Sequence, residues 1–552
     1  MDAEHTLRML TRLAARQPDQ ACNLKAALRG RLGWLAEIAF KVAVDTGDPI
    51  GKVLAEELRR SGSLELARLL LTRCDSPRVE ASIPLVELAL VATEMVLAAA
   101  AHDDDGKAET DGAATLAELK HKLGVRLQRI GRNSEGAELL AEAVVLRRQL
   151  VSRGRKELSH LLAMSLFCLG TCRSALRQYR EALAATLEAV ALFTALSHSD
   201  PARFRPGLAM SLLNLGADLG RLERRQEAAA ATARAVYLYR ELHRLQPLTY
   251  GPMLSRSLLN LASDYSGLGR RAQALELSHE AVAADRMLAA EQPEHFLDKL
   301  SDSLYGHAKR LLGMRHEQQA REVAREAADL RRKLHSERPA LFRERLTNSL
   351  VLRSICAAKC GSEIEALAAA REAVALARLE LEEFGSGARH LLASSLDCLG
   401  NRLEESGCGE EAFVASDEAV QLRRLLFEAE GEAFREDLAL SLVNLSKRLW
   451  TANRAETALE LGREASQHFK VLASRWPSSQ APLLARALTN LFHAQEQCGR
   501  RGEAIATCRE ALAWWRRSDK QGPASHGPEI GHCLSFLSWR TGARSVGKRT
   551  TR

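Results

Sequence analysis

Leucines recur along the chain at the spacing of a buried helix face. In the stretch LAMSLLNLGADLG, Leu208, Leu212, Leu215 and Leu219 follow one another at intervals of four, three and four residues. That spacing places them on one stripe of an α-helix, where they can face a common core. The stretch LALSLVNLSKRLW, which begins at Leu438, has the same stripe. The pattern therefore predicts amphipathic helices that are built alike in distant parts of the chain.

These similar stretches follow a fixed period of 46 residues. A serine column shows the period without an insertion, in Ser165, Ser211, Ser257, Ser303, Ser349, Ser395 and Ser441. Two alanine columns repeat it, in Ala182, Ala228, Ala274, Ala320, Ala366, Ala412, Ala458 and Ala504, and in Ala189, Ala235, Ala281, Ala327, Ala373, Ala419, Ala465 and Ala511. A boundary column holds Pro201, Pro247, Pro293, Pro339, Pro477 and Pro523, with Gly385 and Gly431 in the two gaps. A fixed period of this length predicts a repeat array.

Each repeat is predicted to be a hairpin of two helices. The leucine stripe marks the first helix, a turn that often holds a glycine follows, and the second helix runs from a Glu-Ala pair to the boundary, where proline ends the hairpin. Two such helices would each hold about 20 residues and measure about 30 Å. The small side chains of the alanine columns would let the two helices approach closely. One hairpin cannot bury its apolar faces alone, so stacked repeats predict an all-α solenoid.

The repeats are expected to fill most of the chain. We predict about nine of them over residues 114–522, and a helical N-terminal cap or degenerate repeats over residues 1–101, where the register is lost. An acidic, glycine-containing linker is expected at residues 102–113. A C-terminal capping helix is expected at residues 523–541, because the last repeat would otherwise expose its stacking face. The basic residues 542–552 are expected to form a tail.

A Leu-Gly pair, followed by alanines twelve and nineteen residues after that glycine, resembles the tetratricopeptide repeat. The pattern occurs at Leu169-Gly170, Ala182, Ala189, at Leu215-Gly216, Ala228, Ala235, and at Leu399-Gly400, Ala412, Ala419. The usual unit has 34 residues, so the chain resembles a long-helix variant. Two large aromatic positions of the family hold smaller residues here, such as Leu166 and Thr186. The resemblance implies a right-handed superhelix of antiparallel helix pairs with a concave peptide-binding surface, and it implies no chemistry.

One polar column lies beside the leucine stripe. Asn214 is about 100° around the helix from Leu215, and Asn260, Asn444 and Asn490 occupy the same place in their repeats. In tetratricopeptide proteins that bind extended peptides, an asparagine at this place lines the groove and hydrogen-bonds the ligand backbone. A primary amide suits that role because it both donates and accepts. The alternative is that each asparagine bonds a neighbouring helix and takes no part in binding.

Four cations are expected to face the same groove as the asparagines. Lys309 and Lys447 lie three residues after that position, and Arg256 and Arg486 lie four residues before it. Together they favour an acidic or carboxylate-ended peptide as the partner. Repeats between residues 303 and 400 lack the asparagine, which predicts a groove split into two segments, near residues 210–265 and 440–495.

The sequence contains no pattern that indicates catalysis, a metal or a cofactor. The 11 cysteines form no CxxC, and the pairs Cys168 with Cys172 and Cys356 with Cys360 come without a second His or Cys pair at metal-site spacing. Buried free thiols explain them better than a metal site does. The serine column is repeated, whereas a catalytic nucleophile is needed once. We therefore expect no enzyme, no metal site and no cofactor.

Charge and hydropathy favour a protein partner. The net charge of +8 comes from 78 basic and 70 acidic residues, a mild excess that does not indicate nucleic-acid binding. The N-terminus lacks the apolar core of a signal peptide. The most apolar run, residues 83–101, holds Glu87 and Glu94 and does not indicate a membrane span. We expect a cytoplasmic location, with the nucleus as an alternative.

The leading hypothesis is a non-enzymatic protein-interaction scaffold or adaptor that binds a peptide or helix in its concave groove. One alternative is a regulatory subunit whose catalytic domain lies on another chain. A less favoured alternative is a nucleic-acid-binding helical solenoid, against which the low aromatic content and the lack of a recurring base-reading pair both count.

Overall fold

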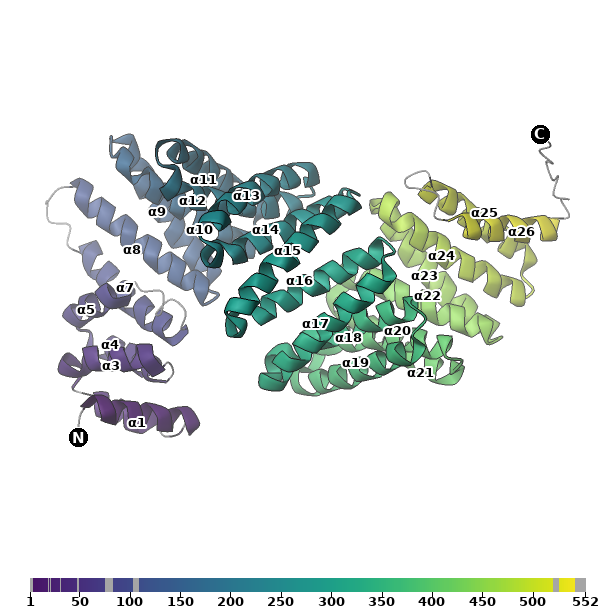
Figure 1. Ribbon diagram of the computed structural model, residues 1–552, viewed down its shortest axis with the longest axis horizontal. Helices are drawn as coiled ribbons and strands as arrows, with labels where there is room; N and C mark the ends of the chain where they lie inside the picture. The colour runs from purple at the N-terminus through teal and green to yellow at the C-terminus, as the bar shows by residue number, and fades with distance from the viewer. Residues whose placement is uncertain are drawn as a thin grey trace. The chain divides into compact units, whose positions relative to one another are not determined.

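The computed structural model describes residues 3–17, 19, 21–29, 31–46, 49–74, 83–102, 109–519 and 526–541 (Figure 1). Almost all of these residues are helical, and no strand occurs among them. The chain divides into two compact bodies, residues 1–284 and 285–552. The division falls inside helix α15 (Arg271–Glu291), and each body is described by itself.

The first body opens with helices that do not keep the 46-residue register. They are α1 (Ala3–Arg16), α2 (Ala21–Leu28), α3 (Leu32–Thr46), α4 (Ile50–Ser61), α5 (Leu64–Cys74) and α7 (Ile83–His102). Leu24, Leu54 and Leu88 lie fully buried in their shared core. Residues 103–108 of the expected acidic linker lie outside the described residues. Residues 109–113 belong to the first turns of α8, where the carboxylate of Asp111 suits the positive end of the helix dipole.

Nine helix pairs follow in the described part of the chain. We call the first member of each pair the A helix: α8 (Glu109–Arg129), α10 (Ser159–Ala175), α12 (Pro201–Arg221), α14 (Pro247–Gly267), α16 (Pro293–Gly313), α18 (Pro339–Lys359), α20 (Arg389–Glu405), α22 (Arg435–Thr451) and α24 (Pro477–Gln497). The second member is the B helix: α9 (Asn133–Ser152), α11 (Tyr179–Ser199), α13 (Arg225–Leu245), α15, α17 (Glu317–Glu337), α19 (Glu363–Phe384), α21 (Gly409–Glu430), α23 (Ala455–Arg475) and α25 (Arg501–Asp519). Tandem antiparallel helix pairs confirm the predicted all-α solenoid.

The columns read from the sequence form the contacts between helices. Every member of the serine column and of both alanine columns is at most 1% exposed. The Leu-Gly pair lies where the two helices of a repeat come closest. A Cβ atom added to Gly170 would lie 2.6 Å from Thr186 Oγ1 and 3.4 Å from the Ala182 carbonyl oxygen. Close approach of the helix backbones therefore explains why these positions stay small.

The prolines act differently from our expectation. We expected each proline to end a hairpin, but Pro201, Pro247, Pro293, Pro339 and Pro477 each open the next A helix. Proline suits the first helical position because its missing N–H would have no partner there. A single residue such as Gln246, at φ −140° and ψ 81°, connects the two helices. Pro523 lies outside the described residues.

Two boundaries without proline use short 3₁₀ turns. Gly385 and Gly431 both have φ of 62° and begin η3 (Gly385–Ala388) and η4 (Gly431–Phe434). A similar turn, η2 (Lys156–Leu158), precedes α10. The glycines replace the proline because a left-handed backbone is needed at these two junctions.

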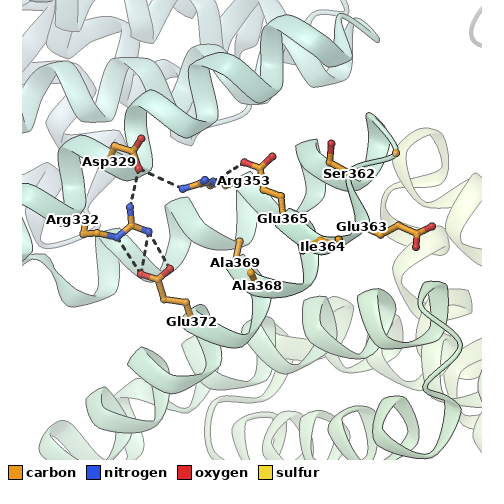
Figure 2. Close-up of a pocket in the computed structure, with 11 residues that line it drawn as sticks. Asp329, Arg332, Arg353, Ser362, Glu363, Ile364, Glu365, Ala368, Ala369 and Glu372 are labelled. Carbon is orange, nitrogen blue, oxygen red and sulfur yellow. Dashed lines mark hydrogen bonds and ion pairs between the residues drawn. The ribbon is translucent and has the colours of Figure 1, made fainter.

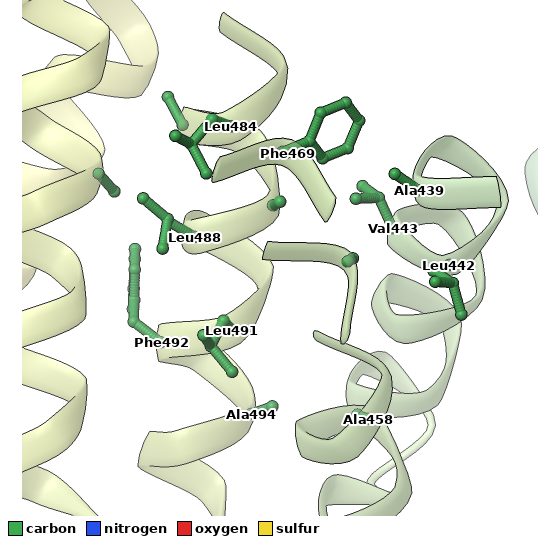
Figure 3. Close-up of a cluster of buried hydrophobic side chains, with 14 of the residues drawn as sticks. Ala439, Leu442, Val443, Ala458, Phe469, Leu484, Leu488, Leu491, Phe492 and Ala494 are labelled. Carbon is green, nitrogen blue, oxygen red and sulfur yellow. The ribbon is translucent and has the colours of Figure 1, made fainter. Parts of the chain in front are cut away.

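The second body ends in a cap. Helix α26 (Gly527–Thr541) packs its fully buried Cys533 and half-buried Phe536 against α24 and α25. Figure 3 shows the core beneath, with Leu442 from α22 and Leu488 and Phe492 from α24. Residues 542–552, the expected basic tail, and residues 523–525 lie outside the described residues.

By length and composition alone, helix α11 is long and apolar enough to cross a membrane. Among the helices of the described residues, no other one meets both criteria. Its Ala182 and Ala189 are nevertheless fully buried, as in the other B helices. Its apolar character is therefore explained by packing between α10 and α12.

Candidate partner-binding face

The predicted binding residues all lie on A helices. The first body holds Asn214 on α12 and Arg256 and Asn260 on α14; the second holds Lys309 on α16, Asn444 and Lys447 on α22, and Arg486 and Asn490 on α24. We call the surface formed by these positions of the A helices the A-helix face. Each body presents its own part of this face.

Two of the four asparagines already bond a neighbouring repeat. The half-buried Asn214 donates from Nδ2 to Thr171 Oγ1 on α10, at 3.1 Å. Asn490 is 7% exposed and donates from Nδ2 to the Val443 carbonyl oxygen on α22, at 3.0 Å. These contacts correspond to the alternative kept open above, in which the amide joins neighbouring A helices.

The other two asparagines keep their amides available. Within the described residues, neither Asn260 nor Asn444 makes a side-chain hydrogen bond, although both are half-buried. Asn260 lines a cavity of about 660 Å³ formed by α12, α13 and α14. Gly216 and Gly220 also line this cavity, and a Cβ atom added to Gly220 would meet no atom within 4 Å. The A-helix face of the first body therefore contains a hollow with an unused amide at its edge.

Charged groups surround Asn260 in the same cavity. Arg221, Arg225 and Asp264 line it together with Thr232. Burial raises the pKa of Asp264, and a hydrogen bond from Thr232 Oγ1 at 3.0 Å opposes that rise. Arg225 Nη1 donates to the Gly267 carbonyl oxygen at 3.2 Å. The cavity therefore offers donors and acceptors together, as an extended peptide backbone requires.

The acidic residue of this cavity was not among the residues predicted to bind. Asp264 lies four residues after Asn260, and Asp218 lies four residues after Asn214, so each pair shares a helix face. Asp218 is 2% exposed and accepts a hydrogen bond from Thr186 Oγ1 at 3.1 Å. The 46-residue offset between Asp218 and Asp264 was the signal available in the sequence.

The four predicted cations differ in how far they are already neutralised. Lys447 Nζ lies 3.3 Å from Glu404 Oε1, and Lys309 Nζ lies 5.7 Å from the centre of the Tyr305 ring. Arg256 and Arg486 are exposed, and neither forms an ion pair within the described residues. Surrounding protein desolvates Arg486 and lowers the pKa of its guanidinium. The two arginines are thus the cations best able to accept a new carboxylate partner.

A larger cavity of about 890 Å³ lies between α17, α18 and α19 (Figure 2). Arg353 of α18 occupies the repeat position that holds the leucine of the Leu-Gly pair in other repeats, such as Leu215 or Leu399. Arg353 Nε lies 3.0 Å from Glu365 Oε1, and Arg353 Nη1 lies 3.4 Å from Asp329 Oδ1. This break in the leucine column was not predicted, although the 46-residue offset exposes it.

The charges of this second cavity neutralise one another. Burial alone would raise the pKa of Glu365, but hydrogen bonds from Arg321, Arg325 and Arg353 outweigh it and lower the pKa to about 2. Arg332 joins α17 to α19 through Glu372, with an Nη2 to Oε2 distance of 3.0 Å. The network therefore helps to join three helices around a cavity where Arg353 replaces the leucine of the Leu-Gly pair.

The described residues contain no group of three or more His, Cys, Asp or Glu side chains arranged to hold a metal ion. Burial raises the pKa of Cys168 to about 12 and that of Cys172 to about 11, so both stay thiols at neutral pH. A metal ligand or a nucleophile would need the thiolate. Cys356, whose pKa burial raises to about 12, behaves in the same way.

This architecture first defines a class: an α-solenoid built from 46-residue helix pairs. Residues 254–284, from α14 and α15, match the family model of the tetratricopeptide repeat. The other pairs have the same columns at the same period, so they resemble the repeat that residues 254–284 match, with longer helices.

Comparison with solved structures gives further likenesses. The chain is similar to BtubC (BKLC) from P. vanneervenii, at 19% identity and a TM-score of 0.37, over 46% of this chain and 92% of that one. It is also similar to the apo form of RapI, at 11% identity and a TM-score of 0.39, over 56% of this chain and 99% of that one. Among curated protein sequences, none matches the chain.

Proposed function

We propose that this protein is a non-enzymatic interaction scaffold that binds an extended segment or a helix of a partner protein on its A-helix face. Tetratricopeptide-like folds generally mediate protein–protein interaction. One observation carries the finer proposal: Asn260 leaves an unbonded amide at the edge of a 660 Å³ polar cavity on that face. An amide that is half-buried and unbonded gains more from a ligand than one that already bonds a neighbouring helix.

The proposal assigns binding to two segments, one in each body. In the first segment Asn260 and Arg256 carry the contacts, and in the second Asn444 and Arg486 carry them. Asn214 and Asn490 serve mainly to join neighbouring A helices, because their amides already have partners. Two arginines without ion pairs favour a partner that presents carboxylates, since a charge-assisted hydrogen bond is about twice as strong as a neutral one.

Capture of partners from a cell lysate by the tagged full-length chain, followed by mass spectrometry, tests the proposal. Arg256→Ala/Asn260→Ala should lower recovery of the captured protein about tenfold, and so should Asn444→Ala/Arg486→Ala. A matched control on the B helices, Arg240→Ala/Glu280→Ala, removes an ion pair of 2.5 Å and should leave recovery unchanged. Equal recovery by the wild type and both A-helix variants would refute binding on this face.

The alternative of a regulatory subunit predicts the same binding face and differs in the partner. If the captured partner is an enzyme, its activity with and without the scaffold decides between an adaptor and a regulator. An adaptor leaves that activity unchanged while it alters which other proteins are recovered.

A further inference from the structure

Two histidines meet between α24 and the terminal helix α26. His493 lies on α24 and His532 on α26, and their Nε2 atoms are 2.8 Å apart. Two imidazole nitrogens at that distance share one proton between them, because one must donate to the lone pair of the other. The pair therefore directs at least one ring lone pair into the space between the two helices.

The repeat explains why these two side chains meet. His493 lies 46 residues after Lys447, and His532 lies 46 residues after Arg486. The pair thus occupies two positions of the A-helix face that face each other between successive A helices. Earlier repeats place other residues at these positions, such as Lys309 with Asn348. Among the nine repeats and the cap, histidine stands at both positions only here.

The surroundings hold the His493 ring in place and keep it neutral. Trp450 of α22 stacks on this ring, with centres 4.7 Å apart and planes 18° apart. Gln497 Nε2 donates to the Trp450 carbonyl oxygen at 2.9 Å. Burial first, and His532 second, lower the pKa of His493 to about 4. His532 is exposed, so the pair combines a fixed imidazole with one that solvent reaches.

We propose that His493 and His532 bind a divalent transition-metal ion, Zn²⁺ or Cu²⁺, and thereby fasten the cap helix α26 to α24. Neutral imidazole is a preferred ligand of both ions. When both Nε2 atoms bind the ion, the shared proton leaves Nε2, and each neutral ring carries its proton on Nδ1. A tetrahedral ion with bonds of 2.0–2.1 Å would hold the two nitrogens about 3.3 Å apart, so the rings need to separate by about 0.5 Å. Rotation of the exposed His532 side chain supplies that movement.

Two protein ligands define a weak site. No third His, Cys, Asp or Glu joins the pair among the described residues, so water completes the coordination. The neighbouring Cys533 is fully buried, and its thiol is in hydrogen-bond contact with Cys508 of α25 and Thr489 of α24. Bound metal favours the state in which α26 is docked, because the undocked state holds a single ligand. This site does not depend on the proposed partner-binding function.

Titration of the full-length protein with Cu²⁺, followed by electron paramagnetic resonance, tests the proposal. The wild type should show a copper signal with two nitrogen ligands at micromolar copper. His532→Ala and His493→Gln should each lose one nitrogen and weaken binding at least tenfold. The matched control His390→Ala removes a half-buried histidine from another A helix, α20, and should behave as the wild type.

Amide hydrogen exchange with Zn²⁺ gives an independent readout. Zn²⁺ should slow exchange in α26 of the wild type, and it should not do so in His532→Ala. The proposal would be overturned if the copper signal were unchanged in His532→Ala. It would also be overturned if Zn²⁺ did not change the amide exchange rate of α26 in the wild type. Circular dichroism of each histidine variant should match that of the wild type, which shows that the variant is folded and that its binding results can be compared.

Discussion

A left-handed residue lies in the turn between the two helices of each repeat, whether or not it is a glycine. The column runs at the 46-residue period, with φ between 60° and 83°, through Gly131, Arg177, Glu223, Gly269, Arg315, Gly361, Gly407, Asn453 and Gly499. The hairpin geometry therefore requires this backbone conformation. Residues with a Cβ atom adopt it at a cost of about 1 kcal/mol.

Exchanging residue types within this column should change stability in opposite directions. Arg315→Gly should raise the free energy of unfolding by about 0.5–1 kcal/mol, and Gly499→Ala should lower it by a similar amount. A Cβ atom at Gly499 meets nothing within 4 Å, so its effect comes from the backbone alone. Urea midpoints of the two variants check this. Shifts of the same sign would contradict the requirement for a left-handed residue.

Burial of His121 predicts a pH dependence in the first body. Burial first, then Arg147 and Lys122, lower the pKa of His121 to about 3. The unfolded chain binds a proton at this residue near pH 6.5, so its contribution to stability is complete above pH 6.5 and is lost as pH falls toward 3. His121→Gln should flatten the loss of stability between these values, measured by urea unfolding at several pH values. An unchanged pH profile would show that His121 titrates normally.

The asparagine column shows what sequence could and could not predict at this scale. Its place on the A helices follows from the helical period and the 46-residue repeat. The sequence does not show which asparagine amides lack a hydrogen-bond partner, because the partners lie in a neighbouring repeat. Asn214 bonds Thr171, 43 residues away, and Asn490 bonds the carbonyl oxygen of Val443. Packing decides between two roles of the same residue.

At the scale of elements, buried polar contacts connect several B helices to the next A helix. Arg331 of α17 is 4% exposed and donates to the Arg345 carbonyl oxygen at 2.9 Å and to Ser349 Oγ at 2.7 Å. Its Nη2 also lies 2.7 Å from Asp302 Oδ1. Arg147 makes the same kind of contact with Ser165. The serine column is thus partly explained as the acceptor for a buried arginine 18 residues earlier.

Removing this arginine should cost more than replacing it with an aromatic residue. Phe193 and Phe469 occupy the position of Arg331 in other repeats. Arg331→Ala should lower the free energy of unfolding by about 3 kcal/mol, since it leaves a hole and unpaired polar groups. Arg331→Phe should recover at least half of that loss. The neighbouring surface variant Arg332→Ala should cost under about 1 kcal/mol in the same urea titration. Equal losses for all three would contradict the assignment.

The B helices carry a ladder of ion pairs whose members are 40 residues apart. It joins Arg148–Glu188, Arg240–Glu280, Arg286–Glu326, Arg332–Glu372, Arg378–Glu418, Arg424–Glu464 and Lys470–Glu510. The equivalent pair between α11 and α13 is Thr194 with Arg234, which breaks the ladder. These pairs are largely exposed, so each contributes little by itself.

Completing the ladder should stabilise the first body slightly. Thr194→Arg/Arg234→Glu should show a favourable coupling energy of about 0.5 kcal/mol in a double-mutant cycle. Because the pair is exposed, about 1 M NaCl should abolish the coupling. A coupling that persists at high salt would indicate a contact other than the ion pair.

For the whole molecule, a strict period allowed the helix pairs, their length and their small contact residues to be predicted. The period could not predict the N-terminal helices, because residues 1–101 do not share it. The period also did not show whether the prolines end one helix or begin the next, because a boundary residue can do either. The candidate face followed from the columns, whereas the cavity beside Asn260 also depends on Gly220, where an added Cβ atom would meet nothing within 4 Å.

Hydrogen exchange of the full-length chain with and without its captured partner tests the central claim most directly, namely that partners bind on the A-helix face in two segments. We predict slower exchange in α12 and α14 and in α22 and α24, with B helices such as α13 and α23 unchanged at their solvent-facing residues. The protection should disappear in Arg256→Ala/Asn260→Ala for the first segment and in Asn444→Ala/Arg486→Ala for the second. Protection confined to the B helices, or to residues 3–102, would contradict the account.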